Sequence, residues 1–290
     1  MIKHLLAAGM LVLLVSCSWG YGSPRDYSKF VSARLLDDKK SILFTYHRYT
    51  YRPATGWRAF PDGGIPRYEQ DRSLIGIYDL TRKKVTILRR EKNRDWQPGS
   101  GLYTIHAVNG AKALLAQGGQ LRGAFKLGLR YLLFDVAELS AASLDLQGDL
   151  ARRGRDCGEI YLVAPDGTLL FVTQPLSTDG NSRSRRKNDD ESEIWVRTAG
   201  GDYLKVAAAA LYETVRNGEA IYWVRATRQF HAFSLGTLQS RPAPEFRYGD
   251  YVDVTEGAAL SADRKGLEYG IKVNGAWQYR PLEISPRLLK

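Results

Sequence analysis

Short apolar segments closed by turn residues are the feature of this sequence that most constrains its fold. They recur along the chain, for example at Ser41–Tyr46, Leu74–Leu80, Tyr131–Val136 and Glu159–Val163. β-Branched and aromatic residues are common in them, and each ends within a few residues, which favours strands over helices. We therefore predict an all-β fold. Residues 206–215 are the one stretch in which either a short helix or a buried strand is expected.

The turns between these segments predict hairpins. Asp166-Gly167, Gly200-Gly201 and Asn274-Gly275 supply the positive φ of tight hairpin turns, and a fourth hairpin is expected over residues 77–85. The apolar strands that enter hairpins begin 57, 62, 37 and 37 residues apart, near Leu74, Tyr131, Glu193, Phe230 and Leu267. A spacing near 40 residues with insertions is typical of four-stranded propeller blades, so we predict a β-propeller of five to six blades. A pair of β-sandwiches is the alternative.

Three segments resemble the blades of TolB-like bacterial β-propellers of the periplasm. They are Ile77-Tyr78-Asp79-Leu80-Thr81, Phe134-Asp135-Val136 and residues 160–167, which end in Pro165-Asp166-Gly167. The resemblance covers roughly residues 30–285 and implies a propeller over this region.

The N-terminus resembles a lipoprotein signal peptide. A basic start and the apolar run Leu5–Val15 precede Leu14-Val15-Ser16-Cys17, which is similar to the bacterial lipobox. The resemblance implies cleavage before Cys17, lipid on its thiol and amine, and, because Ser18 follows, an outer-membrane destination facing the periplasm or the cell surface. An ordinary secretory signal is the alternative. We therefore expect a signal peptide at 1–16, a lipidated Cys17 and flexible tether at 17–29, and a propeller domain at 30–290.

The charge balance narrows the class of partner. The chain has 42 Lys and Arg against 31 Asp and Glu, a formal charge of +11, which favours anionic partners. Since a protein anchored in the envelope does not meet nucleic acid, we expect phospholipid, lipopolysaccharide, peptidoglycan or an acidic protein instead. Two Cys and four His are not clustered, so neither a metal nor a cofactor is expected.

Two segments are candidates for binding. Residues 46–72 interleave aromatic residues with arginines and are broken by Pro and Gly, a combination that suits sugar rings, carboxylates or a partner protein. The alternative is an insertion whose aromatic residues pack on the propeller rim. In residues 181–192 a basic block abuts an acidic one, which predicts either a solvated loop or electrostatic docking on an anionic surface. The predicted contact residues are Tyr49, Tyr51, Arg52, Trp57, Arg58 and Arg67 in the first segment, and Arg183, Arg185, Arg186 and Lys187 in the second.

The titratable residues favour binding over catalysis. His47, His106 and His231 are far apart in sequence, and Cys157 has no His nearby to act as a base. Asp79, Asp135 and Asp166 stand at turns, where an Asx hydrogen bond to the backbone is the expected role. We therefore predict a non-catalytic binding or assembly platform for an envelope protein complex or an anionic glycan. The alternative is a carbohydrate-active hydrolase or lyase, in which carboxylates converge near the propeller axis.

Overall fold

A computed structural model describes residues 25–52, 67–92, 103–117, 130–176, 191–208, 210–216, 219–247 and 256–289. These residues form five antiparallel sheets, numbered here in chain order, in which strands adjacent in sequence pair with one another. The first four sheets have four strands each and the fifth has three. The strands are β1 Arg25–Leu35, β2 Ser41–Arg52, β3 Arg67–Asp79 and β4 Lys84–Lys92; β5 Tyr103–Asn109, β6 Lys112–Gln117, β7 Arg130–Asp135 and β8 Ser140–Leu144; β9 Arg155–Val163, β10 Leu169–Pro175, β11 Glu193–Arg197 and β12 Tyr203–Ala208; β13 Ala210–Arg216, β14 Glu219–Val224, β15 Gln229–Ser234 and β16 Gln239–Pro242; β17 Glu256–Leu260, β18 Leu267–Val273 and β19 Ala276–Pro281.

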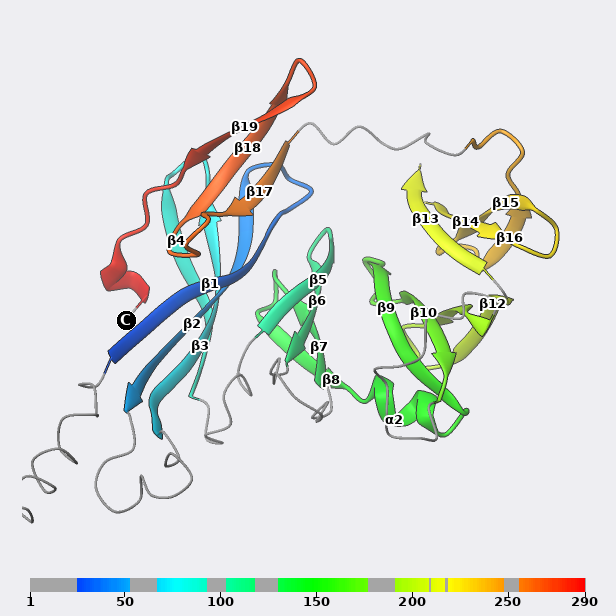
Figure 1. Ribbon diagram of the computed structural model, residues 1–290, viewed down its shortest axis with the longest axis horizontal. Helices are drawn as coiled ribbons and strands as arrows, with labels where there is room; N and C mark the ends of the chain where they lie inside the picture. The colour runs from blue at the N-terminus through cyan, green and yellow to red at the C-terminus, as the bar shows by residue number, and fades with distance from the viewer. Residues whose placement is uncertain are drawn as a thin grey trace, which may run out of the picture.

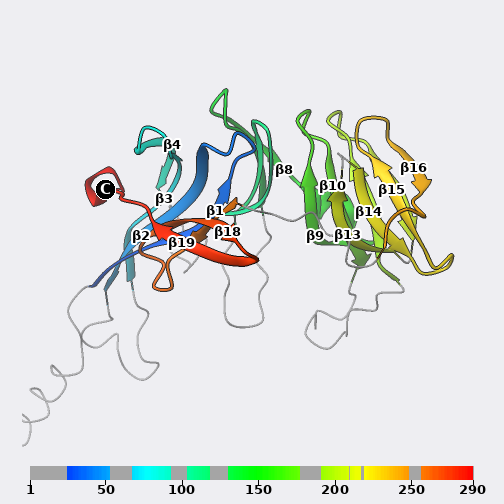
Figure 2. The same cartoon turned by 90° about the horizontal axis from the view of Figure 1, so that it is seen from above.

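The five sheets are arranged as the blades of a β-propeller. The first strands of neighbouring sheets lie side by side, because β1 contacts both β17 and β5, and β5 contacts β9. Figures 1 and 2 show the fifth sheet beside the first, at the opposite end of the molecule from the fourth. The predicted all-β propeller is therefore confirmed, with five blades among the residues that the structure describes. The five strands expected to enter hairpins are β3, β7, β11, β15 and β18, one from each sheet.

Burial on both faces explains why many strands are apolar without alternation. In β10, Leu169 and Phe171 pack against the second sheet, whereas Leu170 and Val172 pack against the fourth. Side chains alternate between the two faces of a strand, so each face of this blade fills a different junction. Among the described residues, hydrophobic clusters fill the junctions of the first sheet with the fifth and the second, and of the third sheet with the second and the fourth.

The predicted hairpin turns form at the turn residues named from the sequence. Asn274 and Gly275 both have positive φ (51° and 81°), and Gly167 and Gly201 have φ of 92° and 95°. Several other turns place a non-glycine residue at positive φ, where its Cβ is strained. These residues are Lys39, Lys83, Leu139, Arg228, Leu238 and Arg264.

Three local features differ from the sequence expectation or were left open by it. β1 begins at Arg25, so residues 25–29 belong to a strand rather than to the tether. Residues 206–208 fall in β12 and residues 210–215 in β13, which decides for strands over a helix. A six-residue helix, α2 (Leu146–Ala151), lies between the second and third sheets and was not predicted. No helix in the described ranges is both long and apolar enough to span a membrane.

Candidate functional site

A row of aromatic side chains lies on one face of β1 and β2. Tyr27 stands directly opposite Tyr49 in the antiparallel register, Arg25 opposite Tyr51, and Lys29 opposite His47. Directly opposed residues project from the same face of a sheet, so two strands contribute one continuous surface. We call this surface the β1–β2 ladder; its residues are Arg25, Tyr27, Lys29, His47, Tyr49 and Tyr51.

The rings of the ladder are in contact. Tyr27 stacks on Tyr49 with ring centroids 5.1 Å apart, and forms a T-shaped contact with Tyr51 with ring centroids 6.4 Å apart. His47, which is buried, continues the row with its ring centroid 5.2 Å from that of Tyr49. Tyr27 is 40% exposed, so the row offers an aromatic surface to solvent at one end and joins the core at the other.

The ladder carries positive charge without a carboxylate of its own. Within the described ranges, Arg25 and Lys29 form no ion pair. Asp26 lies on the opposite face of β1, where its carboxylate accepts a 2.6 Å hydrogen bond from Thr50 and lies 3.9 Å from Arg48. The strand alternation thus separates the acidic residue from the two cations, and leaves a surface of rings and positive charge.

The structure places only part of the predicted contact set. Tyr49 and Tyr51 lie on the ladder, and Arg52 and Arg67 are paired in register at the ends of β2 and β3. Sequence reasoning missed Arg25, Tyr27 and Lys29 because it placed them in the tether. Their period-two spacing was the available signal. The predicted residues outside the described ranges are Cys17, Trp57, Arg58, Arg183, Arg185, Arg186 and Lys187.

The three aspartates named from sequence serve turns, as expected. The carboxylate of Asp79 accepts hydrogen bonds from the backbone N–H groups of residues 81 and 82, that of Asp135 from residues 137 and 138, and that of Asp166 from residue 168. A 2.5 Å hydrogen bond from Lys112 and those backbone groups lower the pKa of Asp135. The three carboxylates lie in turns of separate sheets.

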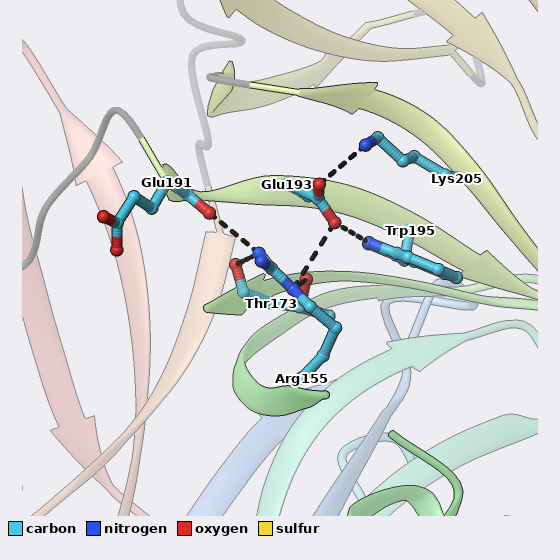
Figure 3. Close-up of polar contacts among 6 residues, drawn as sticks. All are labelled: Arg155, Thr173, Glu191, Glu193, Trp195 and Lys205. Carbon is cyan, nitrogen blue, oxygen red and sulfur yellow. Dashed lines mark hydrogen bonds and ion pairs between the residues drawn. The ribbon is translucent and has the colours of Figure 1, made fainter. Parts of the chain in front are cut away.

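Figure 3 shows the polar contacts of Glu193, a largely buried carboxylate of the third sheet. It accepts hydrogen bonds from Lys205 Nζ at 2.7 Å and Trp195 Nε1 at 2.8 Å, and lies 3.4 Å from Arg155 Nε. Burial raises the pKa of Glu193, but these donors and the charge of Arg155 outweigh it, and the net shift is downward. A general acid needs a raised pKa. Glu193 is instead a fixed anion that ties β9, β11 and β12 together.

Arg155 extends this network from Glu193 to two further residues, Thr173 and Glu191. Its guanidinium donates to Thr173 Oγ1 at 3.1 Å and to the carbonyl oxygens of Thr173 and Glu191 at 3.2 and 2.8 Å. Arg155 therefore joins the start of β9 to the end of β10 and to the residues before β11 (Figure 3).

The remaining titratable residues named from sequence lie apart from one another. His47, His106 and His231 each lie beside a tyrosine, in the first, second and fourth sheets. Cys157 in β9 is half-buried, and Tyr131 donates its O–H to the Cys157 sulfur at 3.9 Å. In the part of the chain that the structure describes, no three His, Cys, Asp or Glu residues are grouped to hold a metal ion.

No protein-family model matches the chain, and no curated protein matches it at a significant level. Among solved structures, it is similar to an oligogalacturonate lyase from Vibrio parahaemolyticus (9% identity, 91% of this chain and 67% of that one, TM-score 0.37). It is also similar to an acylaminoacyl peptidase from Pyrococcus horikoshii (10% identity, 87% and 39%, TM-score 0.41). A third is the β-propeller domain of the Trilobed protease from Pyrococcus furiosus (11% identity, 89% and 82%, TM-score 0.33). With TM-scores below 0.5, these similarities carry no argument about the function of this chain.

Proposed function

We propose that this protein is a non-catalytic binding platform for an anionic polymer of the bacterial envelope, held at the outer membrane by lipid on Cys17. The observation that carries the binding role is the β1–β2 ladder, which combines stacked tyrosines with two cations on one face. Aromatic faces contact the flat side of a sugar or an apolar group, and the cations attract carboxylate or phosphate. The formal charge of +11 adds a long-range attraction for the same class of partner.

The placement of the carboxylates favours binding over the hydrolase or lyase alternative. Asp79, Asp135 and Asp166 are engaged by backbone donors in three different sheets, and Glu193 is fixed by its own cations. Acid–base hydrolysis of a glycosidic bond uses two carboxylates on either side of one bond. Asp79, Asp135 and Asp166, from which the alternative would draw such a pair, each accept hydrogen bonds within their own turn.

The binding role is tested on polygalacturonate, which carries one carboxylate on every sugar ring, as a soluble model polymer. Tyr27→Ala should weaken binding about tenfold, as truncating an aromatic hot spot does, and Tyr27→Phe should retain most of it. Arg25→Gln combined with Lys29→Gln should weaken binding and flatten its salt dependence, because exposed charges are screened by salt. The charge-matched control is Arg82→Gln with Lys83→Gln, on the β3–β4 turn.

The same experiment decides the alternative. The polymer should keep its chain length after incubation with the wild-type protein, which size-exclusion chromatography measures. Shortened chains would favour the lyase or hydrolase. If the wild type does not bind the polymer, or if the ladder variants bind as well as the charge-matched control, the platform proposal fails.

The anchor has a separate test. Cys17→Ser should abolish lipid attachment and leave an unprocessed precursor or a soluble periplasmic protein, because lipid chains rather than a membrane-spanning helix would hold the protein. Mass spectrometry of the native N-terminus measures the modification. An unmodified mature N-terminus in the wild type, at residue 17 or elsewhere, would refute the lipoprotein assignment.

A further inference from the structure

A second aromatic surface lies on the fifth sheet, away from the β1–β2 ladder. Trp277 and Tyr279 project from the same face of β19, are 38% and 48% exposed, and have ring planes within 13° of each other. Leu267 and Tyr269 of β18 project from the other face, which packs against the first sheet. The Trp277–Tyr279 pair therefore lies on the face of this blade that points away from the first sheet.

Two glycines leave the room for these rings to come close to the sheet. A Cβ built at Gly270 would meet Tyr279 at 2.5 Å and Trp277 at 3.0 Å, and one at Gly257 would meet Trp277 at 3.3 Å. Gly270 stands opposite Tyr279 in the register and Gly257 opposite Gly270, so Trp277 reaches from β19 across β18 to β17. Both rings come close to the same point above Gly270 and stack on each other, with centroids 5.7 Å apart. We call this exposed stacked pair the platform.

The edges of the platform carry polar groups. Lys272 stands opposite Trp277 and Glu268 opposite Pro281, both on the platform face of β18. A pyranose ring presents a flat face of C–H groups with hydroxyl and carboxylate groups around its rim. If such a ring stacks on this aromatic pair, its carboxylate can lie near the ammonium group of Lys272 and its hydroxyl groups near Glu268. Sites with an apolar platform and a few polar groups at its rim are typical of small-ligand recognition.

We propose that Trp277, Tyr279 and Lys272 form a second contact surface that stacks the pyranose rings of an acidic polysaccharide. The inference rests on the proposed function, which it extends from anionic polymers in general to polymers of acidic sugars. The positive charge of the chain and the Lys272 ammonium match the carboxylates of such a polymer. A polymer that contacts both the ladder and the platform gains affinity through the linked second contact.

The test compares polygalacturonate, which has rings and carboxylates, with polyglutamate, which has carboxylates alone. Trp277→Ala should weaken binding of polygalacturonate about tenfold and leave binding of polyglutamate unchanged. Gly270→Ala should act in the same direction although both rings remain, because the added Cβ would meet Tyr279 at 2.5 Å and displace it from its stack with Trp277. Gln278→Ala, on the opposite face of the same strand, is the matched control and should bind as the wild type does. Thermal unfolding of each variant separates lost binding from lost folding.

The outcomes also separate this inference from the proposed function. If Trp277→Ala and Gly270→Ala bind polygalacturonate like the wild type while the ladder variants do not, the platform inference is overturned and the proposed function stands. If Trp277→Ala weakens the binding of both polymers equally, ring stacking is refuted, and the effect of Trp277 on binding comes from its part in the folded structure. If the wild type binds neither polymer, the proposed function fails and the inference that rests on it fails too.

Discussion

Glu193→Gln is the perturbation that tests the internal network of the third sheet most directly. The change keeps the shape of the side chain but removes the charge that faces Arg155, Lys205 and Trp195 (Figure 3). Breaking a fully buried ion pair costs about 3–5 kcal/mol, and a hydrogen bond to a charged group contributes about 1.5–3 kcal/mol. Glu193 and Arg155 are 15% and 14% exposed and 3.4 Å apart, so water offsets part of the loss. We expect a destabilisation of about 2 kcal/mol.

The sign of the pH dependence follows from the downward shift in the pKa of Glu193 from its ordinary value of 4.5. A carboxyl whose pKa is lower in the folded state stabilises the fold above the unfolded pKa, and this contribution is lost as the pH falls through the folded pKa. The difference in unfolding free energy between the wild type and Glu193→Gln should therefore be constant from pH 7 down to about pH 5. It should shrink as the pH falls below 4.5.

Urea unfolding at several pH values measures the destabilisation and its dependence on pH. In thermal unfolding, a change of about 2 kcal/mol in a domain of this size lowers Tm by about 4–8 °C. Glu219→Gln is the control, because its partner Arg241 is half exposed and water can replace the lost ion pair. A Glu193→Gln protein as stable as the wild type at pH 7 would refute the argument that this network holds the blade together. So would a difference that does not change with pH.

Two further predictions concern the core and a turn. Thr45→Val should destabilise the fold by about 1–2 kcal/mol, because Thr45 donates a buried 2.7 Å hydrogen bond to the carbonyl of Tyr103 across the junction of the first and second sheets. Thr50→Val is the control: the hydrogen bond of Thr50 is exposed, so this change should alter stability in urea little. Equal losses of stability in the two variants would contradict the argument. Leu139→Gly should raise the unfolding free energy by about 0.5–1 kcal/mol, because Leu139 has a strained φ of 56° and its side chain is 53% exposed. Glu138→Gly, at the neighbouring residue, is the control and should lower the unfolding free energy. A loss of stability in Leu139→Gly would show that its side chain matters more than its backbone strain.

The elements that sequence predicted well are those specified by neighbouring residues. Asn274-Gly275 requires a tight turn because both residues adopt positive φ, and the apolar run Leu169–Val172 is a strand whichever sheets flank it. The Asx turns of Asp79, Asp135 and Asp166 are equally local, since each carboxylate meets backbone donors two or three residues away. The helix α2 was missed because six residues that include Gly148 carry almost no helical signal.

Tertiary structure alone decided which distant residues meet. Tyr27 and Tyr49 stack because β1 and β2 pair in one register, and a shift of one residue would send the two rings to opposite faces. Arg155 meets Glu193 only because β10 lies between β9 and β11. Trp277 comes close to β17 and β18 only because Gly257 and Gly270 are paired in register beside it. Turn residues and apolar runs act over a few residues, so the sequence by itself determined the strands, the hairpins and the blade type. Strand register and sheet packing act between segments far apart in the chain, and they alone determined the aromatic surfaces and the ion-pair network.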